Sequence, residues 1–197
     1  MFDSDLYAKA REYHGKPWYS SVYCFNMCLE KFGIGEMIGK TKISTASILL
    51  LWCGCSNYDD GFYWKEYEPH LARELHKMWA KVLGIDIGDN IKEEFPHQTI
   101  DLLQEPEKLV TLGQDFDIVF DGRFSETQNM CRVLHRKIWF RPEHFQNKLR
   151  QEVGRILKPQ WIYIVSGVNM GYDFVWQNQN GEMELRGYTL DSEVILK

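Results

Sequence analysis

The chain has 197 residues, of which 44% are hydrophobic and 26% charged, and this balance is typical of one globular domain with a sizeable core. Its formal net charge of −5 argues against a protein that binds nucleic acids or anionic membranes through bulk positive charge. No run approaches the roughly 20 apolar residues of a membrane span, and the acidic start Met1–Asp5 is not followed by the apolar region of a targeting signal. The five cysteines follow no framework spacing, which predicts free thiols and a cytoplasmic protein.

Residues 1–46 are predicted to form a helical arm ahead of the core. Apolar residues at helical spacing predict one helix over residues 3–15 and a second over residues 19–31. Gly33 ends the second helix, and the glycine-rich stretch 33–39 is predicted to be a loop. Because this arm precedes the first predicted strand, we expect it to add a layer to the core.

The core begins with an uninterrupted apolar run, Ile48–Trp52, which predicts a strand buried on both faces of a parallel sheet. Residues 57–68 are polar and aromatic and predict a long loop. Pro69 suits the first turn of a helix, and an apolar stripe follows it at Leu71, Leu75, Met78 and Trp79. Lys81–Ile87 is the second predicted strand.

The next part of the chain continues this alternation. Gln98–Leu103 is predicted to be a third strand, Pro106–Leu112 a short helix, and Asp115–Asp121 a fourth strand. Two helices are then predicted, over residues 125–140 and over Pro142–Leu157.

Trp161–Val165 is the fifth predicted strand, and Asn180-Gly181 between two β patterns predicts a hairpin. Strands that alternate with helices predict an α/β fold, with a core over residues 47–197 that forms a single domain with the N-terminal helical arm. We expect a doubly wound, mostly parallel, Rossmann-like sheet with helices on both faces and an antiparallel hairpin at its C-terminal end.

Ligands of such sheets bind beyond the carboxyl ends of the strands. Gly54 follows the first predicted strand, and the acids Asp86, Asp101 and Asp121 lie in or just after the next three. The predicted site therefore combines a glycine turn with three carboxylates at one edge of the sheet.

Over roughly residues 47–167 the chain resembles the class I S-adenosylmethionine-dependent methyltransferases. Five stretches carry the resemblance, in the order that the family has them: Leu49–Ser56, Val82–Asp86, Ile100–Leu102, Phe116–Asp121 and Arg155–Ile164. The resemblance implies S-adenosylmethionine as cofactor, S-adenosylhomocysteine as product, and in-line methyl transfer without a metal. It also implies cofactor contacts at Trp52, Gly54, Ser56, Asp86, Ile87, Asp101, Leu102 and Asp121.

Three of these contacts have a clear physical reason. Gly54 lets the backbone approach the cofactor where a Cβ atom would clash. Asp86 can accept two hydrogen bonds from a ribose diol, each contributing roughly 1.5–3 kcal/mol because the acceptor is charged. Asp101 can accept a hydrogen bond from the exocyclic amine of adenine. Much of the catalysis can then come from holding the nucleophile and the methyl group in line.

Three features depart from the family pattern. Trp52 stands where the family has an acid at the end of the first strand, and Ser56 stands where it has a second glycine. Asp86 follows Gly54 by 32 positions, against the roughly 20 of a nucleotide-binding βαβ fingerprint. The alternative interpretation is therefore a non-catalytic methyltransferase-like binding or scaffold protein. A nicotinamide-dependent dehydrogenase fits less well because the turn lacks the GxGxxG pattern.

Asp121, Arg123 and Glu126 follow the fourth strand, where an acceptor would lie, and each is a candidate base or orienting group. Helix capping by Ser125 and Glu126 is the other interpretation. The low positive charge, and a fourth motif without the Asn/Asp-Pro-Pro-Tyr signature, favour a small-molecule acceptor over nucleic acid.

No metal site is predicted. Cys53 and Cys55 are one residue apart and lack a matching His/Cys pair, which is poor zinc geometry. The six histidines form no ligand pattern; His135 or His144 is either catalytic or part of a solvated helix face. The oligomeric state is not indicated by the sequence.

Overall fold

A computed structural model describes residues 20–40, 42–54, 69–113, 116–122, 142–167, 172–190 and 193–196. Three predicted segments lie outside these ranges: the helix over residues 3–15, the loop over residues 57–68 and the helix over residues 125–140.

The described strands form one eight-stranded sheet of order β3-β2-β1-β4-β5-β6-β7-β8. The first five strands of the chain pair in parallel, and the last three add to β5 in antiparallel fashion. The strands are β1 Ser47–Leu51, β2 Lys81–Asp86, β3 His97–Thr99, β4 Ile118–Asp121, β5 Ile162–Gly167, β6 Tyr172–Gln179, β7 Glu182–Leu190 and β8 Glu193–Leu196. The helices are α2 Ser20–Lys31, α3 Ile34–Met37, α4 His70–Lys77 and α6 Pro142–Ile156, with 3-10 turns η2 Ile43–Thr45 and η4 Pro106–Leu112.

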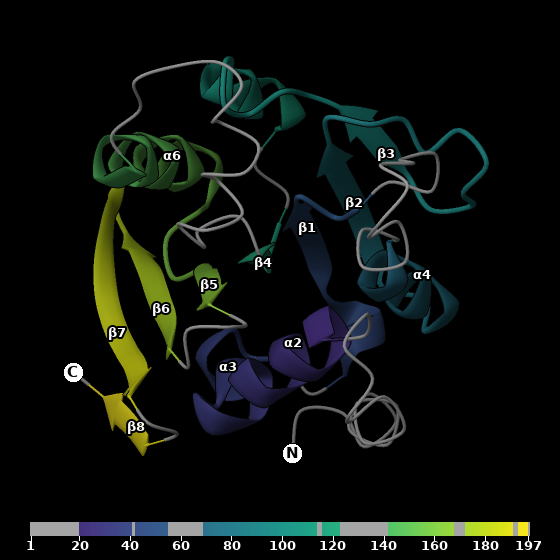
Figure 1. Cartoon of the computed structure of the whole chain (residues 1–197). Coiled ribbons are helices and arrows are strands. Elements are labelled where there is room, and N and C mark those ends of the chain that lie inside the picture. Colours follow the sequence, from purple (N-terminus) through teal and green to yellow (C-terminus); the bar gives the residue numbers. More distant parts are fainter. Residues whose placement is uncertain are drawn as a thin grey trace.

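The apolar run of β1 contributes to two separate cores because successive side chains of a strand point to opposite faces. Ile48 and Leu50 belong to a core with α2 and α4, whereas Leu49 and Leu51 belong to one with α6 and η4. In Figure 1, α2 and α3 lie below the strands and α6 lies above them. This arrangement explains why the sequence of β1 shows no polar alternation.

β3 and β4 are shorter than the sequence pattern predicts, whereas β5 ends two residues later, at Gly167. β4 begins at Ile118, and just before it the Asp117 backbone nitrogen donates to the Ser47 carbonyl at 2.7 Å while its carboxylate accepts from the Ser47 nitrogen at 2.8 Å. β3 ends at Thr99, and the Asp101 carboxylate accepts a hydrogen bond from the Leu103 nitrogen at 3.1 Å. This local bond bends the chain, so the prediction that a strand continues to Leu103 is wrong.

Two short elements were not predicted. The stretch expected to be a loop contains the one-turn helix α3, which begins after Gly33 with a left-handed φ of 60°. The strand β8 adds a fourth antiparallel member to the C-terminal end of the sheet. Both elements are only four residues long, and their periodicity is too short to stand out in the sequence.

The C-terminal hairpin forms at the predicted position. Asn180 and Gly181 join β6 to β7 with φ angles of 58° and 101°, the left-handed values that a two-residue turn of this kind needs. Buried Asn178 fastens the hairpin to α6, because its Nδ2 donates to the carbonyls of Gly154 and Leu157 while its Oδ1 accepts from the Gly181 nitrogen. The prediction of an antiparallel C-terminal end is confirmed.

Among the described helices, none has both the length and the apolar character that a membrane crossing would need.

Candidate functional site

The turn after β1 leaves the sheet through residues with left-handed backbone. Cys53 still donates to the Ile85 carbonyl at 2.9 Å, so pairing with β2 continues beyond the last residue of the strand. Trp52 has a φ of 58° and Gly54 a φ of 94°. A bulky residue in this region is an outlier that costs on the order of 1 kcal/mol or more, and such outliers concentrate at functional sites.

The carboxylate of Asp86 joins the turn after β1 to the turn after β2. Its Oδ2 accepts from the Gly54 nitrogen at 3.0 Å, and its Oδ1 accepts from the Gly88 nitrogen at 3.3 Å. Burial raises the pKa of Asp86 above its ordinary value, although the backbone N–H groups of Gly88, Gly54 and Ile87 act in the opposite direction. Each carboxylate oxygen has a second lone pair, so the group can also accept hydroxyl donors from a ligand.

Asn90 holds the other side of the same turn. Its side chain is buried, and its Nδ2 donates to the Gly54 carbonyl at 2.8 Å while lying 3.7 Å from the Cys53 Sγ atom. The backbone nitrogen of Gly54 is therefore held by Asp86, the last residue of β2, and its carbonyl by Asn90, which follows β2. The sequence pattern did not point to Asn90, which looks like any turn residue after a strand.

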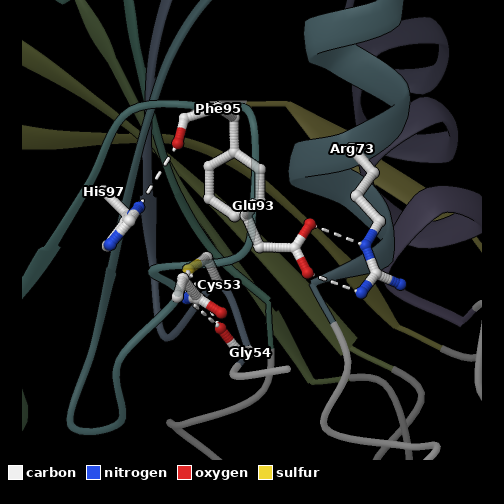
Figure 2. A network of polar contacts seen from close by, with 7 residues as sticks. Cys53, Gly54, Arg73, Glu93, Phe95 and His97 are labelled. Atoms are coloured by element: carbon white, nitrogen blue, oxygen red, sulfur yellow. Dashed lines mark hydrogen bonds and ion pairs between the residues drawn. The ribbon is translucent and has the colours of Figure 1, made fainter. Parts of the chain in front are cut away.

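The segment that carries Asn90 is itself fastened to α4. Arg73 donates to both carboxylate oxygens of Glu93, at 2.9 Å from Nε and 2.7 Å from Nη2 (Figure 2). The Glu93 nitrogen donates to the Asn90 carbonyl at 2.8 Å. A two-pronged, partly buried pair of this kind fixes direction as well as distance, so α4 supports the position of Asn90.

Gly84, inside β2, provides the space beneath the turn. A Cβ atom at this position would lie 2.7 Å from the Cys53 Sγ and 2.9 Å from the Phe95 ring. Cys53, Gly54 and Phe95 appear together beside the Arg73–Glu93 pair in Figure 2. A glycine in a strand here reflects close approach of two neighbouring segments.

Three further predicted cofactor contacts follow β2 and β3. Ile87 is 42% exposed, whereas Leu102 is completely buried in the core that includes α6. Asp101 is half-buried, with one oxygen engaged by the Leu103 nitrogen. Because Asp86 pairs with Thr99 in register, Asp86 and Asp101 both lie at the carboxyl edge of adjacent strands.

Asp121 ends β4 and is buried, with 1% of its surface exposed. The Tyr163 hydroxyl donates to its Oδ2 at 3.3 Å. Burial raises the pKa of Tyr163 well above its usual value, and the negative charge of Asp121 raises it further, whereas Arg150 lowers it. The phenol therefore stays protonated and remains a donor to the carboxylate. Asp121, predicted to contact the cofactor or the acceptor, is therefore enclosed in the protein interior.

The other predicted site residues lie outside the described parts of the chain. These are Ser56, Arg123 and Glu126, together with Cys55, His135 and the side chain of His144. Their roles stay predictions.

Within the described ranges, no group of three or more His, Cys, Asp or Glu residues is arranged to hold a metal ion. No protein-family model and no curated protein sequence matches this chain.

Proposed function

We propose that this protein is an S-adenosylmethionine-dependent methyltransferase with a doubly wound, Rossmann-like core, acting on a small-molecule acceptor. The observation that carries the proposal is the junction of Gly54 and Asp86. A left-handed glycine follows one parallel strand, and its nitrogen donates to a carboxylate at the end of the adjacent strand. A nucleoside-containing cofactor needs this combination of close backbone approach and a charged hydroxyl acceptor.

The order of the strands supports this position for a ligand. From β1 the chain proceeds to β2 and β3 on one side, and β4 and β5 extend the sheet on the other side. Ligands of open α/β sheets bind in the crevice where the strand order reverses, which here is between the carboxyl ends of β1 and β4. Gly54 follows β1 and Asp121 ends β4.

The residues present fit the cofactor. S-adenosylmethionine, when bound, supplies a methyl group activated by a sulfonium. Asp86 would accept hydrogen bonds from the ribose hydroxyls, and Asp101 would accept one from the adenine amine. Ile87, whose apolar side chain is 42% exposed, would lie beside the base. The chain's contribution to rate would be orientation, because an in-line displacement gains most from alignment.

A second candidate is a methyltransferase-like protein that binds a ligand or a partner without catalysis. The burial of Asp121 favours it, because a carboxylate held by Tyr163 with 1% of its surface exposed is poorly placed to take a proton from an acceptor. The two candidates differ in turnover, and binding of the cofactor is compatible with both.

Calorimetric titration of the full chain with S-adenosylmethionine tests the proposal. We expect saturable binding, and we expect Asp86→Asn to weaken it by roughly tenfold or more because a charged acceptor is lost. Glu94→Gln is a matched control, since Glu94 is an exposed acid on the segment after β2, and its binding should stay within about twofold of wild type.

Absence of heat at millimolar cofactor would reject the proposal. Equal affinities for wild type and Asp86→Asn would remove Asp86 from the site. Saturable binding without formation of S-adenosylhomocysteine, across a panel of small acceptors, would favour the non-catalytic candidate.

A further inference from the structure

A row of polar side chains crosses three neighbouring strands near the carboxyl end of β5. The Ser166 hydroxyl donates to the Asp173 Oδ1 at 2.7 Å, and the Thr189 hydroxyl donates to the Asp173 Oδ2 at 3.1 Å. The Asp173 backbone nitrogen donates to the Thr189 Oγ1 at 2.7 Å. Ser166, Asp173 and Thr189 belong to β5, β6 and β7, and Ser166 and Asp173 are register partners.

The row lies next to apolar residues on the same face of the sheet. Ile164 and Val175, two positions away on the same strands, are completely buried in the core beneath α2. Ser166 and Thr189 are also buried, at 0% and 2% exposed, while Asp173 is half-buried. The carboxylate of Asp173 is therefore held in a fixed direction beside apolar residues and stays partly exposed.

The groups that hold Asp173 are neutral. Two are hydroxyls, and the buried thiol of Cys28 on α2 lies close enough to interact with the carboxylate. Burial raises the pKa of Cys28 well above its usual value, and the charge of Asp173 raises it further. The residues that the structure describes include no ion pair to Asp173; Lys31 is close enough to lower the pKa of Cys28 but forms no such pair.

A partly desolvated carboxylate without a cation is expensive, and proteins usually pair such groups. Here the hydroxyls orient the carboxylate without neutralising it. Each oxygen retains a second lone pair, so the group can still accept hydrogen bonds from a cationic donor. The Asp173 carboxylate is therefore suited to bind a cationic group of a ligand.

The position of the row relates it to the candidate site. Val165, which precedes Ser166, pairs in register with Asp121 at the end of β4. Three inter-strand spacings separate β6 from β1 in the sheet order, which is about 14 Å. The row is thus at the same edge of the sheet as the Gly54 turn, beyond β4, with Ser166 on the face opposite to that of Asp121.

We propose that Asp173, oriented by Ser166 and Thr189, is a subsite for a protonated amine, and that the methyl acceptor is a small molecule anchored by an ammonium group. A protonated amine has no lone pair and cannot attack the methyl group. The ammonium group therefore only anchors the acceptor, and a different atom of the acceptor is the nucleophile. The role of the amine as part of an acceptor rests on the proposed function; the binding of an ammonium group at Asp173 does not.

Protein-observed NMR of the full chain, titrated with butylammonium chloride and separately with butan-1-ol, tests the subsite. We expect butylammonium to cause saturable amide shifts at Ser166, Asp173 and Thr189, and butan-1-ol to cause none comparable. Asp173→Asn should weaken the apparent affinity for butylammonium by roughly tenfold or more, because the charge is removed. Glu182→Gln, which removes an exposed carboxylate from β7, should leave it unchanged.

Equal shifts with butan-1-ol, equal affinity in Asp173→Asn, or no saturable shift would overturn the subsite. If Asp173→Asn does not fold, Ser166→Ala and Thr189→Val retain the charge but release it from its fixed direction, and each should weaken butylammonium binding several-fold; unchanged affinity in both would also overturn the proposal.

Titration with S-adenosylmethionine distinguishes this inference from the proposed function. Cofactor affinity in Asp173→Asn should match wild type, because Asp173 is about three strands from the Gly54 turn. Cofactor binding without butylammonium binding would reject only the amine subsite. Butylammonium binding without cofactor binding would reject the proposed function and leave an ammonium site.

Discussion

The Asn180-Gly181 turn and the turn after β1 both have left-handed backbone, and they are stabilised in different ways. The Asn180-Gly181 turn has φ angles of 58° and 101° and uses residues that adopt these values readily. The turn after β1 has a φ of 58° at Trp52 and 94° at Gly54, and tryptophan is a poor choice for this conformation. The hairpin turn is thus encoded locally, whereas the other depends on Asp86 and Asn90 from more than thirty residues away.

Each turn is fastened by one buried asparagine, which allows a matched comparison. Asn178 links the hairpin to α6, and Asn90 links the Gly54 turn to the segment after β2. If the comparison is correct, losing the first should change only stability, while losing the second should also change ligand binding.

The largest expected effect is that of Asn178→Ala. The substitution removes two donors and one acceptor from a buried position, so we expect a loss of about 3 kcal/mol in the free energy of unfolding. Urea denaturation measures this loss, and calorimetry with S-adenosylmethionine should give wild-type affinity. A loss of affinity in this variant would mean that the hairpin is coupled to the site.

Asn90→Ala should have a smaller effect on stability. It removes the amide donor from the Gly54 carbonyl, which keeps only the weaker thiol donor of Cys53 at 3.2 Å, and we expect a loss of about 2 kcal/mol by urea denaturation. Because the turn then loses one of its two anchors, S-adenosylmethionine affinity should also fall by roughly tenfold. Wild-type affinity in a folded Asn90→Ala protein would show that the Asp86 contact alone is sufficient to position Gly54.

The smallest expected effect concerns pH. The pKa of Asp86 is raised in the folded protein, so the native state holds this proton more tightly than the unfolded chain does. The contribution of this group to stability is therefore present at low pH and is lost as pH rises through the folded pKa. Wild type should lose stability relative to Asp86→Asn in urea denaturation as the pH rises above 3.8, the ordinary pKa of this group. The opposite trend would contradict the burial of this carboxylate.

Several parts of the fold could be predicted because their signals are local. The apolar runs of β1 and β5, the spacing of Leu71 and Leu75 in α4, and the Asn180-Gly181 pair all depend on neighbouring residues. The prediction that Trp79 belongs to the same buried stripe is wrong, because Trp79 lies beyond the end of α4 with a φ of 63° and is 86% exposed. The end of β3 was missed because the Asp101 side chain competes with strand pairing by bonding the Leu103 nitrogen.

The candidate site was only partly predictable. Gly54 and Asp86 could be proposed from a strand-turn-strand pattern, and the structure brings them into contact. Asn90 and the Arg73–Glu93 pair carried no such signal, since a turn asparagine and a surface-like charge pair occur throughout any sequence. Their role arises from which segments the sheet brings together.

The sequence by itself determined the alternation of strands and helices, the hairpin, and the presence of acids after the parallel strands. These features follow from side-chain periodicity and from the backbone preferences of single residues. Only the tertiary structure decided that Asp86 and Asn90 hold the two sides of Gly54, that Asp121 is enclosed with Tyr163, and that Asp173 lies among neutral donors. Those contacts depend on strand order and register, which bring residues distant in the chain within hydrogen-bond distance and which no local pattern specifies.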